Sequence, residues 1–226
     1  MHGAGSLAFL LVLGSAWALQ VAPVLTESLT QKNFDLDQFM GKWYEVAVVS
    51  TCPYYMQRKR GNPVIVALEL KPVASEGSFT MTASIIRNGS CEDTSTHYNS
   101  THTPGRFFHH VSRFGADVDS FVVHTNYDEY AMMLLLSTEK PSGNKTTSVK
   151  LYSRTVDVGP AVLDRFKTLV KQHGMSDEAI ILNHYKGECV PGEQLTEPTT
   201  QHRSKRNVAP PGFPAQEEYT DTILPG

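Results

Sequence analysis

Short segments in which apolar and polar residues alternate dominate the chain from residue 64 to residue 154. Residues 79–85 show the pattern most clearly, and a period of two is typical of a half-buried β-strand. Further strands are predicted over 64–71, 107–114, 120–125, 130–138 and 146–154. Because turn-forming residues separate these segments, the pattern predicts an all-β fold, an eight-stranded antiparallel up-and-down barrel.

One helix is predicted after the last long strand. Pro160 suits its first turn and Gly174 its C-terminal end. Its apolar stripe consists of Leu163, Phe166, Leu169 and Val170. A single amphipathic helix at this point is expected to pack on the outside of the barrel. The apolar run 180–182 is a candidate edge strand.

The first eighteen residues have the features of a signal peptide. Residues 7–13 form a short apolar run, and Ala16-Trp17-Ala18 predicts cleavage after Ala18. No later apolar run reaches the ~20 residues needed to span a bilayer. We therefore expect a soluble, secreted protein.

The rest of the chain divides into three parts. Residues 19–33 are expected to form an N-terminal extension and residues 34–192 the barrel. Residues 193–226 are too poor in apolar side chains to fold alone and are expected to form a disordered tail. Within the tail, Arg203-Ser204-Lys205-Arg206 predicts cleavage after Arg206 by a convertase of the secretory pathway. The alternative is a solvated basic patch.

Secretion is consistent with three N-glycosylation sequons, which begin at Asn88, Asn99 and Asn144. The formal net charge of −3 gives no reason to expect nucleic acid as a partner. The cysteines are Cys52, Cys91 and Cys189. In an oxidising compartment two of them are expected to pair, which leaves one over.

An apolar strand that opens with Gly41-Lys42-Trp43-Tyr44 suits the closed end of a barrel. Glycine allows close backbone approach there, and an indole fills the floor. Residues 125–130 fall where two neighbouring strands turn, and Arg154 ends a later strand. These three segments, residues 41–44, residues 125–130 and the strand end at Arg154, resemble in this order the lipocalin family, whose members enclose small apolar ligands in an eight-stranded barrel. The resemblance extends from about residue 34 to residue 191.

Further stretches, including Ser50-Thr51-Cys52-Pro53 and residues 187–194, are similar to a subgroup of lipocalins that is cut from a longer precursor. The dibasic site at Arg206 agrees with such cleavage. The precursors of this subgroup continue into Kunitz inhibitor domains, whereas no cysteine follows Cys189 here. We therefore do not expect protease inhibition.

The resemblance implies a structural role at the barrel floor for five residues: Gly41, Trp43, Thr125, Tyr127 and Arg154. In lipocalins an arginine in the position of Arg154 packs across the floor tryptophan, which is a cation–π contact. The resemblance also implies a disulfide between Cys91 and Cys189. Cys52 is then the free thiol, in a loop over the open end.

Cys52 is the candidate redox and ligand-binding thiol. Arg58-Lys59-Arg60 follows in the same predicted loop, and nearby cations favour the reactive thiolate. Tyr54 and Tyr55 add aromatic faces and a candidate radical relay. The resemblance implies reductase and ligand-linking chemistry at this thiol. The alternatives are a buried cysteine without a role and a cysteine capped by a cellular thiol.

Lys150 is the second candidate ligand-binding residue. It shares strand parity with Arg154, so an inward Arg154 implies an inward Lys150. A buried ammonium without a partner is costly. One interpretation is therefore that Lys150 pairs with an anionic ligand group, such as a haem propionate or an acidic chromophore. The other is that its amine reaches solvent at the rim.

The chain departs from the family pattern around the mouth. The resemblance implies other lysines for chromophore attachment, but those places hold Val111 and Ser137. The haem-contacting histidine of the loop before the last strand is absent from residues 139–145. Substitute iron ligands are His97, His109 and His110, although a histidine on a barrel strand is more often a wall residue.

The leading hypothesis is a secreted protein whose barrel holds a small hydrophobic, partly anionic ligand, such as haem or a tryptophan-derived chromophore. Cys52 would reduce or trap oxidants, with no obligatory cofactor and at most weak reductase activity. The second hypothesis is a protein that forms mixed disulfides with plasma proteins through Cys52. The third is a cysteine-dependent lipocalin isomerase, which needs an inward thiol beside an activating group. The sequence has no metal-finger spacing, phosphate loop or credible carboxylate pair, so no metal site is predicted.

Overall fold

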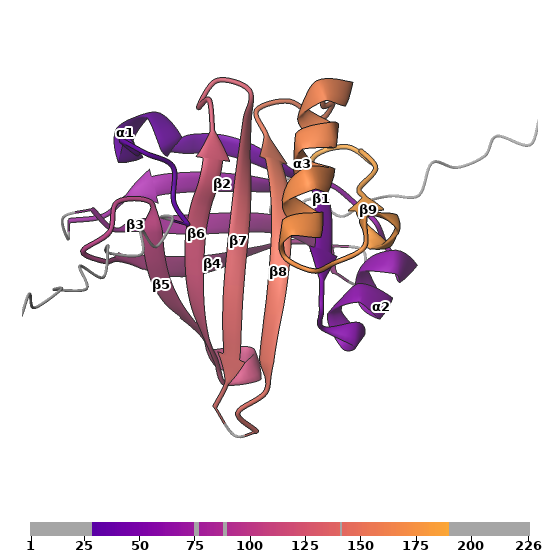
Figure 1. Ribbon diagram of the computed structural model, residues 1–226, viewed down its shortest axis with the longest axis horizontal. Coiled ribbons are helices and arrows are strands. Elements are labelled where there is room, and N and C mark those ends of the chain that lie inside the picture. Colours follow the sequence, from indigo (N-terminus) through magenta and orange to yellow (C-terminus); the bar gives the residue numbers. More distant parts are fainter. Residues whose placement is uncertain (1–28, 75–76, 88–89, 141, 190–226) are drawn as a thin grey trace, which may run out of the picture.

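The computed structural model describes residues 29–74, 77–87, 90–140 and 142–189 (Figure 1). The predicted cleavage sites at Ala18 and Arg206 and the sequon at Asn88 lie outside these residues. Within the described part of the chain, no helix is long and apolar enough to cross a membrane.

The described residues form one sheet of nine strands, eight of which close into an antiparallel barrel. The strands are β1 (Gly41–Ser50), β2 (Val66–Pro72), β3 (Phe79–Arg87), β4 (Ser90–Ser100), β5 (Arg106–Val111), β6 (Ala116–Thr125), β7 (Tyr130–Glu139), β8 (Lys145–Ser153) and β9 (Ile181–Leu182). Consecutive strands pair from β2 to β8, then β8 pairs with β1, and β1 pairs with β2 to close the barrel. The predicted eight-stranded up-and-down barrel is confirmed.

Helix α3 (Pro160–Gln172) packs outside the barrel, as the sequence predicts (Figure 1). Phe166, Leu169 and Val170 are buried against the outer wall. A second apolar cluster lies in the barrel interior around Trp43. The other helices are α1 (Leu36–Phe39), α2 (Pro53–Gly61), and the 3₁₀ turns η1 (Ser112–Phe114) and η2 (Asp177–Ala179).

The barrel floor is built around Trp43, whose ring is fully buried. The guanidinium carbon of Arg154 lies 3.6 Å from the ring centroid. The same guanidinium donates to three backbone carbonyls, those of Tyr127 (2.8 Å), Lys42 (2.7 Å) and Gln38 (2.9 Å). Arg154 therefore connects the floor residues on β1 with the α1 end and the β6–β7 turn.

The remaining floor residues shape the backbone. Thr125 donates to the carbonyl of Tyr130 at 2.8 Å and accepts from the N–H of Tyr127 at 2.9 Å. Gly41 has φ of 91°, in the left-handed region that favours glycine.

Several elements differ from the sequence prediction. Residues 53–61 form helix α2 instead of a loop; Pro53 suits its first turn, and Met56 is its only buried residue. Strand β4 has no counterpart in the prediction, because polar residues occupy most of both its faces and hide the alternation. Phe114 lies in η1 and not in a strand, and β6 begins at Ala116, four residues before the predicted start.

The C-terminal segment completes the wall between β1 and β2. β1 pairs with β2 only as far as Glu45, and from Ala47 it pairs with β9. Beyond β9, the N–H of Asn183 donates to the carbonyl of Val46 at 2.9 Å, and the N–H of Ile65 donates to the carbonyl of His184 at 3.0 Å. We call this strip, residues 181–184 between β1 and residues 63–65, the seam. The disulfide between Cys91 and Cys189 fixes the chain that follows it.

Candidate functional site

A carboxylate lies inside the barrel near the seam. Glu45 is two residues after Trp43 on β1, so strand parity turns both side chains inward. Only 5% of Glu45 is exposed. A buried carboxylate is costly unless it is paired and hydrogen-bonded, so its neighbours determine the character of this region.

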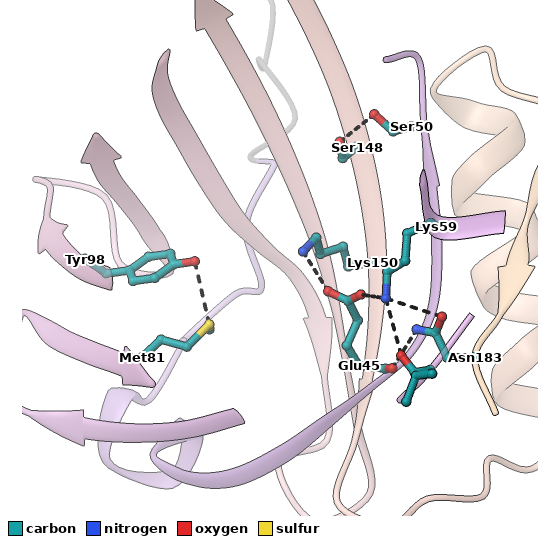
Figure 2. A network of polar contacts seen from close by, with 9 residues as sticks. Glu45, Ser50, Lys59, Met81, Tyr98, Ser148, Lys150 and Asn183 are labelled. Carbon is teal, nitrogen blue, oxygen red and sulfur yellow. Dashed lines mark hydrogen bonds and ion pairs between the residues drawn. The ribbon is translucent and has the colours of Figure 1, made fainter. Parts of the chain in front are cut away.

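Two lysines from distant parts of the chain share this carboxylate (Figure 2). Lys150 on β8 lies 2.7 Å from Oε2, and Lys59 on α2 lies 2.8 Å from Oε1. Asn183 of the seam accepts from Lys59 at 3.4 Å and donates to the backbone carbonyl of Glu45 at 2.8 Å. We call Glu45, Lys59, Lys150 and Asn183 the Glu45 cluster. It joins the barrel interior, α2 and the seam.

A β-bulge in β1 sets the geometry of this cluster. Glu45 is opposite Tyr152, but the next partner pair is Ala47 with Leu151, which makes Val46 the extra residue. Val46 and Ala47 both belong to the outer apolar cluster. Glu45 and Lys150 are therefore diagonal neighbours on the inner face, within reach of each other.

Within the cluster, Glu45 and Lys150 stabilise each other's charged forms. Burial raises the pKa of Glu45, but Lys150 and Lys59 lower it more, to about 2. Burial lowers the pKa of Lys150, but Glu45 above all raises it well above its ordinary value. One carboxylate and two ammonium groups give the Glu45 cluster a net charge of +1.

Tyrosine side chains lie near the Lys150 ammonium. The Tyr55 ring of α2 has its centroid 6.0 Å from Lys150 Nζ. Burial, and then Glu45, raises the pKa of Tyr55 to about 12. Burial also raises the pKa values of Tyr98 and Tyr152. These phenols stay protonated at physiological pH and keep their capacity to donate hydrogen bonds.

Of the three histidines considered as iron ligands, His109 faces the interior. It is 4% exposed, its ring centroid lies 4.3 Å from that of Tyr98, and Nδ1 is 3.5 Å from Ser120 Oγ. Burial, and then Lys150, lowers the pKa of His109 to about 4, so its imidazole is neutral. His97 and His110 are exposed, and His110 binds Asp117 at 2.8 Å.

Cys52 is the free cysteine and is partly exposed, just past the end of β1. Its N–H donates to Ser50 Oγ at 3.1 Å, and its carbonyl accepts from Met56 N–H at 3.1 Å, at the start of α2. The predicted cationic triplet is arranged differently from the sequence expectation. Lys59 turns to Glu45, and Arg58 lies 5.9 Å from the Tyr55 ring centroid.

Other predicted sites lie at the surface or rim. Asn99 and Asn144, the sequon asparagines within the described ranges, are both exposed. Val111 and Ser137 are half-buried. Across the residues that the structure describes, no three histidine, cysteine, aspartate or glutamate side chains are grouped to hold a metal ion.

The sequence prediction placed Lys150 on an inner strand position and left open whether its amine meets an anionic ligand group or reaches solvent at the rim. The partner of Lys150 is Glu45. The signal was present in the sequence, because Glu45 shares the parity of Trp43. Lys59 and Asn183 had no such signal, since neither lies on a segment with a clear inward face.

Comparisons with known proteins agree with this architecture. The sequence model of the Lipocalin / cytosolic fatty-acid binding protein family matches residues 40–187. A lipocalin of Rhinella marina is 31% identical over 174 residues, 76% of this chain and 92% of its own length. The solved structure described as "The Siderocalin Ex-FABP functions through dual ligand specificities" superposes with a TM-score of 0.55 at 22% identity. It covers 67% of this chain and 97% of its own.

Longer relatives share the same region. Protein AMBP of Pleuronectes platessa is 49% identical over 199 residues, 87% of this chain and 55% of the relative. Protein AMBP of Mus musculus is 36% identical over 210 residues, 93% of this chain and 60% of the relative. The chain thus spans somewhat more than half the length of these curated relatives. Lipocalins bind small hydrophobic ligands. The closed barrel and the family match over residues 40–187 show that this chain belongs to the lipocalin family, and within it the chain corresponds to the α1-microglobulin part of AMBP.

Proposed function

We propose that this chain is a secreted lipocalin that holds a small hydrophobic ligand with an anionic group, such as haem or a tryptophan-derived chromophore. Cys52 at the barrel mouth would react with oxidants. The observation that supports the anionic ligand is the Glu45 cluster, which has a net positive charge and includes Lys150 on the inner face of an apolar barrel.

The cluster supports an anionic ligand for a chemical reason. The Lys150 ammonium has three hydrogens, and Glu45 accepts one of them. Tyr55 supplies a protonated hydroxyl nearby, and the His109 imidazole is neutral. A ligand carboxylate beside Lys150 would neutralise the excess charge, and the apolar interior would hold the rest of the molecule.

For haem, the interior offers one group that suits the iron. The neutral His109 imidazole is the form that binds a metal. The Glu45 cluster supplies the cation that a propionate requires. Val111 and Ser137 occupy the places of other family lysines, so attachment of a chromophore would depend on Lys150 and Cys52.

Lys150→Met should weaken binding of retinoic acid about tenfold relative to binding of retinol, because the loss of one buried charge-assisted hydrogen bond costs roughly 1.5 kcal/mol. The two probes share an apolar body and differ in the carboxylate. Fluorescence titration of both measures the ratio. Lys145→Met, an exposed position on the same strand, is the control. An equal loss for both probes would contradict the charge assignment, whereas failure of wild type to bind either probe would overturn the ligand proposal itself.

The oxidant chemistry takes two balanced steps. The Cys52 thiolate attacks an oxygen of a hydroperoxide, the O–O bond breaks, and an alcohol leaves after taking up a proton. The sulfur becomes a sulfenic acid and has lost two electrons. A second thiol then condenses with it to a disulfide and releases water. The partial exposure of Cys52 supports access of both reactants.

Hydrogen peroxide should remove the free thiol of the folded protein and add one oxygen atom to Cys52, because this cysteine is free and partly exposed. Thiol titration and mass spectrometry measure the two changes. Cys52→Ser should show neither change and should bind retinol like wild type. A thiol that reacts only after denaturation would refute the redox role.

The accessibility of Cys52 also favours a second candidate function, mixed-disulfide formation with plasma proteins. Non-reducing electrophoresis of the secreted protein and of Cys52→Ser separates the candidates: high-mass species that persist in the variant would exclude Cys52 as the link. The isomerase hypothesis gains no support, because Cys52 lies beyond β1 and none of its described contacts is with an activating base.

A further inference from the structure

A second β-bulge forms a groove on the outer wall of the barrel, away from the Glu45 cluster. In β6, Val122 is opposite Met133, and the next partner pair is His124 with Met132, which makes Val123 the extra residue. Val122 faces the interior, whereas Val123 packs against the outer apolar cluster, to which Met132 also belongs. Two consecutive side chains, Val123 and His124, therefore lie on the outer face.

Helix α3 forms the other side of this outer groove. The groove has a volume of about 450 Å³ and is lined by Val123, His124, Met132, Arg165, Leu169 and Gln172, among others. Met132 and Leu169 are 3% and 7% exposed. The volume lies in the lower part of the range for small-molecule sites. The groove thus has a buried apolar base and polar groups along one side.

A hydrogen-bonded chain fixes the polar side. Arg165 Nη1 donates to the Tyr130 hydroxyl at 3.1 Å, and this hydroxyl lies 2.9 Å from His124 Nδ1. Because a guanidinium can only donate, the Tyr130 oxygen accepts from Arg165, and His124 Nδ1 is the described acceptor for the Tyr130 hydrogen. Burial, and then Arg165, lowers the pKa of His124. The neutral ring then carries its hydrogen on Nε2, which is a second donor.

The charge of Arg165 has no counter-ion among the described residues. None of their carboxylates lies within 4.0 Å of its guanidinium, and the adjacent Asp164 pairs with Lys167 at 3.1 Å. No acidic residue lines the groove. The guanidinium retains N–H groups that match the two oxygens of a carboxylate.

We propose that the outer groove is a second binding site, which takes a small monocarboxylate with a flat or aliphatic apolar body. The carboxylate pairs with Arg165 and accepts from His124, and the body lies on Met132 and Leu169. This site is separate from the barrel interior, so occupancy of one does not require the other.

Indoleacetate and its neutral amide, indoleacetamide, test this site by NMR titration of isotope-labelled protein. Indoleacetate should shift the signals of Val123, Met132 and Leu169 in a saturable way. Arg165→Gln should weaken its binding about tenfold, the effect of one charge-assisted pair. Indoleacetamide should bind Arg165→Gln and wild type alike. Lys167→Gln, on the same helix but outside the groove, is the matched control.

Gln172→Trp provides an independent test, because an indole at this exposed lining position should fill the groove and abolish binding of both probes. Amide spectra that match wild type outside the groove establish that each variant is folded. Shifts that map to His109 and Met133 instead would place the probe in the barrel and overturn the proposal. Undiminished binding to folded Arg165→Gln would overturn it too.

Discussion

Glu45→Gln should lower the free energy of unfolding at pH 7 by about 3 kcal/mol or more, since breaking a buried ion pair leaves uncompensated buried charge. Two ammonium groups, those of Lys59 and Lys150, would lose their shared carboxylate. Urea denaturation measures the change. Glu188→Gln is the matched control, because Glu188 also has two partners, Lys42 and Tyr44, but at the surface. It should cost less than about 1 kcal/mol.

The same carboxylate predicts a pH dependence. The folded pKa of Glu45, about 2, lies below its ordinary value of 4.5, so its contribution is complete above pH 4.5 and is lost as the pH falls towards 2. The difference corresponds to about 3 kcal/mol. Wild-type stability should therefore fall more steeply than that of Glu45→Gln between pH 4.5 and 2. Parallel curves would show that Glu45 is not held as a carboxylate by the two lysines.

A triple variant separates stability from ligand choice. Replacing Glu45 by Leu and both lysines by Met should restore most of the stability that Glu45→Gln loses, because well-packed apolar groups often replace a buried ion pair without loss. The preference for retinoic acid over retinol should nevertheless disappear. A triple variant that kept this preference would locate the selecting charge elsewhere.

Arg154→Met should lower the free energy of unfolding by about 3 kcal/mol, from the loss of a close cation–π contact and of donors to backbone carbonyls. Arg154 lies over Trp43 and donates to the carbonyls of Gln38, Lys42 and Tyr127. Thermal and urea unfolding measure the effect. Arg113→Met is the control, because Arg113 lies over Phe114 at 5.6 Å on an exposed turn. Similar losses in both variants would argue against a special role for the floor contact.

The sequence was sufficient to predict the barrel architecture, because apolar and polar residues alternate regularly in the strands on which the prediction rests. It also indicated the inward direction of Lys150, through the parity shared with Arg154, whose inward position the lipocalin resemblance implies. Parity alone also places Glu45 on the inner face, because Glu45 lies two residues after Trp43 on the same strand. The bulge at Val46 lies just beyond Glu45 and leaves its direction unchanged.

Other features of the structure leave no signal in the local sequence. Helix α2 lacks an apolar stripe, since Met56 is its only buried residue, so neither the helix nor the turn of Lys59 towards Glu45 could be predicted. Strand β4 is polar on both faces. The outer groove depends on a bulge at Val123 and on the distance from Arg165 to Tyr130, two residues that are far apart in the sequence. Such features follow from tertiary packing.

The seam has a consequence for synthesis. β1 and the start of β2 emerge from the ribosome long before residues 181–184, which lie between them at the mouth. Domains generally fold as units during translation. One side of the barrel wall therefore stays incomplete, and the Glu45 carboxylate stays exposed to water, until the polypeptide as far as Cys189 has left the exit tunnel.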